Sequence, residues 1–212
     1  MKKRVTKIEV QKRDPNRRSI FLDGSFFCGV DHEVLERLDL GVGSEVDEGT
    51  IGRILLTEDR LKARHYALNL LSYRMRSKEE LVRRMLQRHF EKETIDEIVR
   101  DLEEVGLLDD LEFARSWIRT RMELNPRSFY ALERELRLKG VKRDVYKLAE
   151  KDLKEEYDEK EIALVLAKKR LTRLGGLAPA DAKRRLIGYL SRRGFSYEVA
   201  KWVMGQLEEG VG

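Results

Sequence analysis

Hydrophobic and polar positions follow two different periods along this chain. Residues 5–30 favour strands, because short runs of β-branched and aromatic side chains are separated by turn residues. Asp-Gly-Ser at residues 23–25 lies between two such runs, and Asp-Gly tolerates the positive φ angles that a tight hairpin turn needs. A second turn is expected at Asp-Pro-Asn, residues 14–16. Asp31 is expected to cap a short helix that continues through Leu38.

From about Asp47 onward the period becomes helical, and the pattern then repeats. Three ten-residue segments align without gaps, each with apolar residues at its first, fifth and tenth positions and a basic residue at its eighth. They are residues 81–90, 132–141 and 186–195, so their starts lie 51 and 54 residues apart. A helical stretch with one alanine expected to face the core precedes each segment, and a third amphipathic stretch follows it. These alanines are Ala67, Ala114 and Ala163.

This spacing predicts a repeat protein. We expect a mainly α-helical fold in which three tandem three-helix repeats form an elongated, curved array after a small N-terminal β-hairpin region. The expected boundaries are residues 1–46 for the hairpin region, 47–110 for repeat 1, 111–158 for repeat 2 and 159–212 for repeat 3.

The ends of the expected helices carry their own signals. Gly140 and Gly194 lie where the second helix of a repeat should end, at a position that favours the left-handed conformation, and His89 takes this place in repeat 1. Ser77 with Glu80 three residues later is typical of a capping box.

An acidic pair precedes the first helix of repeat 2. The pair is Asp-Asp at residues 109–110, and a metal-binding or acid–base role is one interpretation of it. A helix cap is the better interpretation, because Asp110 directly precedes an amphipathic run and its carboxylate can accept backbone N–H bonds.

Aromatic and leucine side chains recur at helical spacing in repeat 2, which is typical of a core. Two such stripes are expected to face inward: Phe113, Trp117 and Leu124, then Phe129, Leu132 and Leu136.

The distribution of charge distinguishes this chain from a neutral repeat protein. The net charge is +5, and the basic excess lies in the C-terminal half: residues 111–150 hold 10 Lys/Arg against 6 Asp/Glu, and residues 151–212 hold 13 against 10. Residues 1–60 and 61–110 each carry a net charge of −1. Such an excess fits a polyanion or an acidic protein partner, and a solvated surface is the alternative.

The single cysteine and the short apolar runs indicate the compartment. Cys28 cannot form an internal disulfide, so we expect a small buried hydrophobe in a reducing environment. No apolar run approaches the roughly 20 residues of a membrane span. We therefore expect a cytoplasmic protein that does not associate with membranes.

Sequence signatures of catalysis are absent. The chain has no Gly-rich loop followed by Lys-Ser/Thr, no His-Glu-x-x-His and no Gly-x-Ser-x-Gly. Its three histidines are scattered, and with one distant cysteine they offer no metal-ligand spacing. We expect no catalytic residue, no cofactor and no metal, hence a protein that is not an enzyme.

Arginines gather on faces that should point away from the core. On an ideal helix Arg127, Tyr130, Arg134 and Arg137 share the face opposite the leucines of repeat 2, and Tyr130 could stack on an unpaired base. Other exposed arginines are expected in the preceding helix and in repeat 3. The candidate contacts for a partner or nucleic acid are Arg115, Arg119, Arg127, Tyr130, Arg134, Arg137, Arg185 and Arg192.

Several segments resemble the RecX family. They are Gly-Leu-Leu-Asp-Asp-Leu-Glu-Phe-Ala at residues 106–114, Glu-Leu-Arg-Leu-Lys-Gly-Val at 135–141 and Arg-Arg-Gly-Phe at 192–195, while residues 71–81 look like the family's first repeat. The resemblance covers roughly residues 60–207, and the N-terminal hairpin is similar to the extension of some members. His89 departs from the family's glycine and puts only the local helix end in doubt.

The resemblance implies binding in the groove of the RecA–DNA filament, with inhibition of strand exchange and of ATP hydrolysis by RecA. It further implies a monomer that acts in DNA repair, recombination and the SOS response and makes weak contact with single- or double-stranded DNA. The alternative is a helical DNA-binding protein that acts without RecA, since three-helix units resemble helix-turn-helix domains. A net charge of only +5 and the lack of an outstanding recognition helix count against it.

Overall fold

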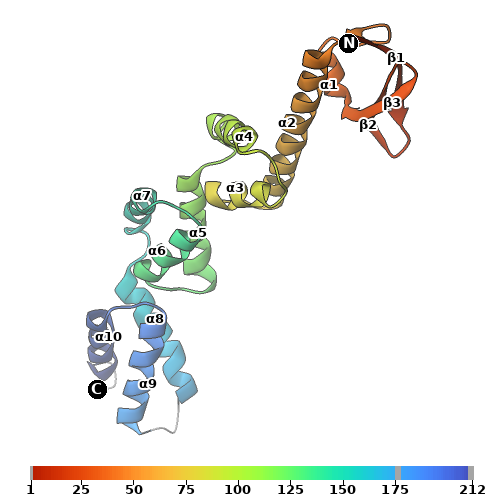
Figure 1. The fold of residues 1–212 in the computed structure, drawn as a ribbon. Coiled ribbons are helices and arrows are strands. Elements are labelled where there is room, and N and C mark those ends of the chain that lie inside the picture. The colour runs from red at the N-terminus through yellow and green to blue at the C-terminus, as the bar shows by residue number, and fades with distance from the viewer. Residues whose placement is uncertain (1, 175–177, 210–212) are drawn as a thin grey trace. The chain divides into compact units, whose positions relative to one another are not determined.

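The computed structural model describes residues 2–174 and 178–209 and is mainly helical, with a small N-terminal sheet, as expected (Figure 1). The chain divides into two compact units. The first takes the residues up to 74 together with residues 82–104, and the second takes residues 75–81 and those from 105 onward. Residues 175–177 and 210–212 of the expected third repeat lie outside the described residues.

The sheet of the first unit has four antiparallel strands in the order β3-β2-β1-β4. Its strands are β1 (Lys3–Gln11), β2 (Asp14–Leu22), β3 (Ser25–Asp31) and β4 (Glu45–Val46). The Asp-Gly hairpin is confirmed, because Asp23 and Gly24 turn between β2 and β3 with φ angles of 49° and 84°.

The expected turn at residues 14–16 is wrong. The chain reverses at residues 12–13, and Asp14 already pairs with Gln11. Pro15 therefore falls at the start of β2, where an irregularity between β1 and β2 leaves room for a residue that has no N–H to donate.

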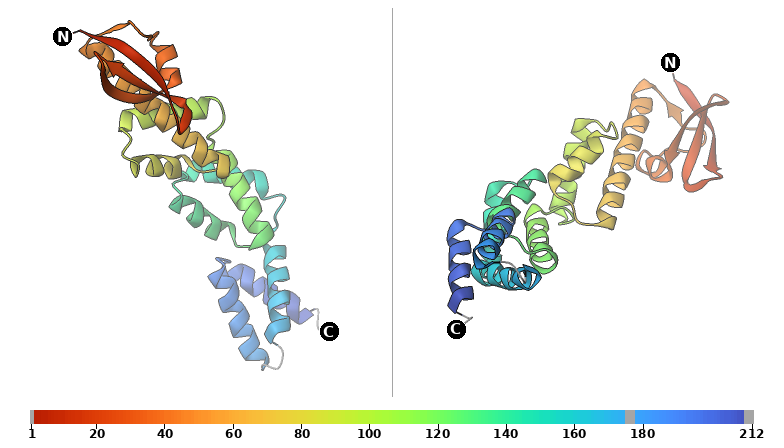
Figure 2. Two further views of the ribbon diagram at one scale, coloured as in Figure 1. Left: turned by 90° about the vertical axis from the view of Figure 1, so that its right-hand side faces the viewer. Right: turned by 90° about the horizontal axis from the view of Figure 1, so that it is seen from below.

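Two aspartates start the helices that cover this sheet, and the cap at Asp31 was expected. Asp31 accepts a 3.0 Å bond from the Glu33 amide and caps α1 (His32–Arg37), and Asp47 accepts a 2.7 Å bond from the Thr50 amide and caps α2 (Glu48–Tyr73). The apolar side of α2 packs on the sheet, where Val5, Ile20, Val30, Ile54 and Leu61 are buried together; Figure 2 shows this layer from two further directions.

Repeat 1 continues with α3 (Lys78–Leu86) and α4 (Lys92–Glu104). In the first unit α4 packs on α2, and Arg60 of α2 reaches Glu97 at 3.1 Å and Asp101 at 3.5 Å. His89, between α3 and α4, takes a left-handed conformation with a φ of 62°. The expected helix end is thus confirmed even though histidine replaces glycine there.

The second unit holds two bundles of three helices. Repeat 2 has α5 (Asp110–Leu124), α6 (Phe129–Leu138) and α7 (Arg143–Leu153), and repeat 3 has α8 (Glu159–Leu171), a short 3₁₀ turn (Thr172–Leu174), α9 (Pro179–Arg192) and α10 (Tyr197–Glu209). The inward alanines of the three repeats are fully buried, as expected.

The core of repeat 2 agrees with the expected stripes at all but one position. Phe113, Phe129, Leu132 and Leu136 are buried, and Trp117 is partly buried against them. The prediction for Leu124 is wrong: its side chain is 80% exposed, because it is the last residue of α5 and lies beyond the core.

Each member of the acidic pair caps a different helix. Asp109, not Asp110, accepts bonds from the amides of Leu111 and Glu112 at the start of α5. Asp110 accepts a 2.8 Å bond from the backbone amide of Lys78, at the start of α3. The capping interpretation is correct, but the position assigned to the α5 cap was off by one residue.

Candidate functional site

A backbone contact joins repeats 2 and 3 inside the second unit. The amide of Ser128 donates to the carbonyl of Arg193 at 3.1 Å, and the Arg193 guanidinium donates back to Asn125 Oδ1 at 2.9 Å and to the Pro126 carbonyl at 2.6 Å. Gly194 comes so close that a Cβ atom there would lie 2.5 Å from Ser128 Oγ. The start of α6 and the end of α9 are therefore held side by side.

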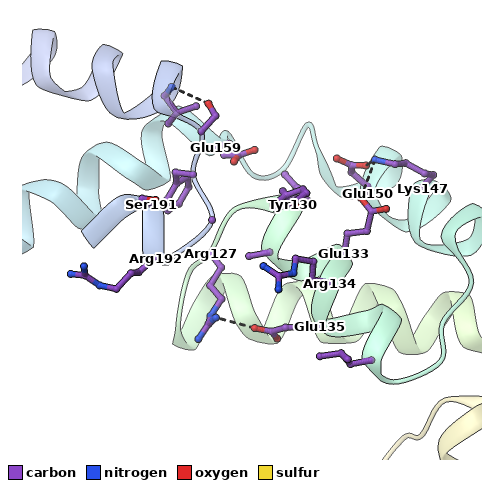
Figure 3. Close-up of a pocket in the computed structure, with 17 residues that line it drawn as sticks. Arg127, Tyr130, Glu133, Arg134, Glu135, Lys147, Glu150, Glu159, Ser191 and Arg192 are labelled. Carbon is purple, nitrogen blue, oxygen red and sulfur yellow. Dashed lines mark hydrogen bonds and ion pairs between the residues drawn. The ribbon is translucent and has the colours of Figure 1, made fainter. Parts of the chain in front are cut away.

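Beside this contact lies an open groove of about 890 Å³, lined by the length of α6, the end of α9 and the start of α10, with residues of α7 and α8 also contributing. We call it the inter-repeat groove. Four of the eight candidate residues line it: Arg127, Tyr130, Arg134 and Arg192 (Figure 3). Tyr130 is 64% exposed, so its ring is available to a partner.

The structure corrects the expected helical phase of Arg127. This residue precedes the Ser128 cap of α6 and is not part of the helix, so it does not share a helical face with Tyr130 and Arg134. Its guanidinium reaches Glu135 at 3.3 Å, and the same carboxylate accepts bonds from Arg121 at 2.8 Å and from the Trp117 indole at 3.1 Å. Arg127 therefore shares one carboxylate with Arg121, and its buried Nε has no hydrogen-bond partner.

Arg134 and Arg192 differ from Arg127 in having no carboxylate within 4.0 Å anywhere in the described chain. Both are exposed, and in Figure 3 the guanidinium of Arg192 extends away from Arg134. Their positive charge is available at two separate points of the groove rim.

The other candidates lie outside the groove. Arg115 forms a two-pronged contact with Asp152, with Nε at 2.9 Å, which ties α5 to α7, and Arg119 lies within 4.0 Å of Glu112 and Glu156. Arg137 on α6 and Arg185 on α9 are exposed and have no ion-pair partner among residues 2–174 and 178–209.

Acidic groove residues were missed by reasoning from the sequence. Lys147 reaches Glu150 at 2.6 Å and Glu133 at 3.7 Å on one side. Glu159, the first residue of α8, is half-buried, and burial, with the nearby charge of Glu150 second, raises the pKa of its carboxyl. These side chains come from three helices, so no spacing in the sequence could have grouped them.

The groove presents cations, acids and one exposed aromatic ring, an arrangement suited to binding a large partner. Among the described residues no group of three or more His, Cys, Asp or Glu side chains could hold a metal ion. None of the helices in the described ranges is both long and apolar enough to cross a bilayer.

Comparison with known proteins gives the family. The chain matches the family model described as the regulatory protein RecX N-terminal domain over residues 3–47. It then matches the models of the first, second and third three-helix domains of RecX over residues 63–102, 109–149 and 156–204. The three expected three-helix repeats are thereby confirmed.

Relatives match nearly the whole chain. The regulatory protein RecX of Bacillus subtilis is 33% identical over 96% of this chain and 77% of its own length, and that of Clostridioides difficile is 30% identical over 96% of this chain and 95% of its own. A crystal structure of regulatory protein RecX superposes with a TM-score of 0.77 at 28% identity, covering 96% of this chain and 99% of that one. The chain therefore belongs to the RecX family of regulatory proteins.

Proposed function

We propose that this protein binds RecA recombinase filaments and inhibits the strand exchange and ATP hydrolysis that RecA carries out. The observation that carries the proposal is the order of family domains, in which an N-terminal domain and all three three-helix domains of RecX follow one another along one chain. The protein would act as a monomeric cytoplasmic regulator in DNA repair, recombination and the SOS response, without a cofactor or a reaction of its own.

The inter-repeat groove supplies a surface for such a partner. Exposed charges add little to folding, typically 0–1 kcal/mol per pair, so unpaired Arg134 and Arg192 do little for this chain alone. They can instead meet an acidic RecA surface or the DNA phosphates exposed in the filament, with Tyr130 packing beside them. Charges of this kind govern association rate and its salt dependence.

The direct test measures ATP hydrolysis by RecA on single-stranded DNA with increasing amounts of this protein, together with co-sedimentation on RecA filaments. We expect a falling hydrolysis rate and co-sedimentation that requires the filament. The purified protein alone should hydrolyse no ATP. An unchanged RecA rate at saturating protein would refute the proposal.

A pair of matched variants tests the groove. Arg134→Glu with Arg192→Glu reverses the two unpaired groove charges, and Arg137→Glu with Arg185→Glu reverses two unpaired charges on the same helices, α6 and α9, outside the groove. We expect the first variant to melt like wild type but to bind filaments weakly, with a smaller salt dependence. If the two variants bind equally well, the groove is not the contact surface.

The second candidate function is DNA binding without RecA, which the unpaired arginines of α6 and α9 also favour. Binding of the protein to bare DNA, measured with the same variants, separates the two. If the groove variant loses bare-DNA binding yet still inhibits RecA, DNA contact and RecA regulation use different surfaces.

A further inference from the structure

Positive charge is concentrated at the start of the chain in a way that the regional totals conceal. Residues 2–22 contain 8 Lys/Arg and 2 Asp/Glu, a net charge of +6, whereas residues 23–60 contain 3 Lys/Arg and 10 Asp/Glu, a net charge of −7. The two nearly cancel over residues 1–60. The basic stretch coincides with strands β1 and β2.

Part of this charge has no carboxylate partner among the described residues. Lys2 and Arg4 lie near Glu45, Lys7 pairs with Glu9, and Arg17 pairs with the buried Glu58. In the described parts of the chain, four cations of the hairpin have no carboxylate within 4.0 Å: Lys3, Lys12, Arg13 and Arg18. Lys12 and Arg13 are exposed and form the turn between β1 and β2.

An aromatic pair lies on the sheet beside Lys7, another cation of the hairpin. Phe21 of β2 is paired in register with Lys7 of β1 on one side and with Phe26 of β3 on the other. The two rings meet edge to face with centroids 5.8 Å apart, and the Lys7 ammonium lies 5.5 Å from the Phe21 ring. Phe26 is 61% exposed, so a large apolar ring faces water beside the Phe21 ring that the Lys7 ammonium contacts.

We propose that this surface, the hairpin face made of Lys7, Lys12, Arg13, Phe21 and Phe26, binds single-stranded nucleic acid. Aromatic rings on a sheet stack on unpaired bases, while neighbouring cations pair with the phosphates. Lys12 follows the end of β1, five residues after Lys7, so at roughly 3.4 Å per residue the two cations are up to about 17 Å apart, which spreads the charge along a bound strand. Base-paired bases do not expose their faces to the rings, so single strands are favoured over duplex.

This surface belongs to the first unit and shares no residue with the inter-repeat groove. Its function requires no RecA, so its test is independent of the proposed regulation. The whole 212-residue chain is titrated against a fluorescent oligothymidylate, and anisotropy is read at several salt concentrations. An oligouridylate and a duplex of matched length are titrated in parallel.

Substitution of Phe26 gives a more specific test than substitution of the charges, because its side chain is exposed and its replacement should not disturb folding. Phe26→Leu keeps an apolar side chain but removes the ring, and Phe26→Tyr keeps the ring. Stacking is worth about 1–3 kcal/mol per base, so Phe26→Leu should weaken binding roughly 5- to 150-fold. Phe26→Tyr should bind like wild type. Equal affinities of the two variants would overturn the proposal.

The charge is tested by Lys12→Gln with Arg13→Gln. Loss of two phosphate contacts should lower the slope of log affinity against log salt by about 1.4 for a single strand. The matched control is Arg53→Gln with Arg64→Gln, which removes the same charge from exposed positions on α2 of the same unit and should leave the slope unchanged.

Comparison of the three nucleic acids completes the test. Binding of oligouridylate as well as oligothymidylate would support a site for single strands of either sugar. Equal binding of duplex, or equal slopes for the hairpin variant and its α2 control, would show that only overall charge attracts the nucleic acid, and the proposal would fail.

Discussion

Replacing Gly194 by alanine tests the close approach of repeats 2 and 3. Gly194 has a φ of 91°, and an added Cβ would lie 2.5 Å from Ser128 Oγ and 2.6 Å from the Ala131 Cβ. Gly194→Ala should therefore lower the free energy of unfolding for two separate reasons. One is the left-handed backbone, and the other is overlap with the start of α6.

Gly106 separates these costs because it shares only the first. Its φ is 71°, and nothing lies within 4 Å of an added Cβ. Left-handed backbone costs a non-glycine residue about 1–2 kcal/mol, and overpacking adds about 1–3 kcal/mol. Gly106→Ala should thus lose about 1–2 kcal/mol of unfolding free energy, and Gly194→Ala about 2–5 kcal/mol.

Amide hydrogen exchange read by mass spectrometry can locate each loss, because a protein of several repeats need not unfold in one step. We expect Gly194→Ala to speed exchange in α9, α10 and the first turn of α6, and Gly106→Ala to act near the start of α5. Equal losses for the two variants would refute the reasoning, since the overlap at Ser128 would then be relieved at no cost.

Three further predictions concern single side chains. Leu136 is fully buried, so Leu136→Ala should lower the unfolding free energy by about 2–5 kcal/mol in urea titrations; an unchanged midpoint would contradict its place in the core. Burial, aided by the charge of Glu58, raises the pKa of the Cys28 thiol from 9.0 to about 11. At pH 8 a thiol reagent should therefore modify the folded protein roughly 100-fold more slowly than the unfolded chain, because only the thiolate reacts. Equal modification rates would contradict the raised pKa. Because the pKa of Glu159 is raised, its carboxyl keeps its proton to a higher pH in the folded state than in the unfolded state, so stability falls as pH rises between the two pKa values. Glu159→Gln should remove this pH dependence and raise the melting temperature at pH 7. A lower melting temperature of the variant at pH 7 would count against burial as the cause of the raised pKa.

Features encoded by neighbouring residues were predictable from the sequence. The Asp-Gly turn, the cap at Asp31 and the second-helix ends at Gly140 and Gly194 each depend on a few consecutive positions. Helical periodicity likewise predicted the burial of Leu132 and Leu136, because apolar residues at this spacing lie on one side of a helix and that side faces the core.

Features that depend on packing between distant segments were not predictable. Arg134 and Arg192 meet at one groove only because α6 lies beside the end of α9. Arg115 and Asp152 are 37 residues apart, and their contact follows from the packing of α5 on α7. The unpaired charge at Lys12 and Arg13 was hidden by summing over a region that also contains the acidic residues following the hairpin.

The junction between repeats explains why one repeat has histidine where two have glycine. Ser77 and Ser128 occupy the same place, four residues before the first leucine of the repeated segment, and both are fully buried. Ser77 Oγ donates to the Lys139 carbonyl, and the Ser128 amide donates to the Arg193 carbonyl, so each serine binds the helix end of the following repeat.

Glycine is needed at such a helix end for two reasons, and only the first applies in repeat 1. At Gly140 and Gly194 the φ angle is positive and an added Cβ would also overlap the preceding repeat, at Glu79 and at Ser128. His89 has the positive φ, but its side chain is exposed and no earlier three-helix repeat within the described residues docks against it. The left-handed conformation alone costs about 1–2 kcal/mol, which a folded repeat can bear, whereas a side chain at the junction would displace the backbone contact that joins two repeats.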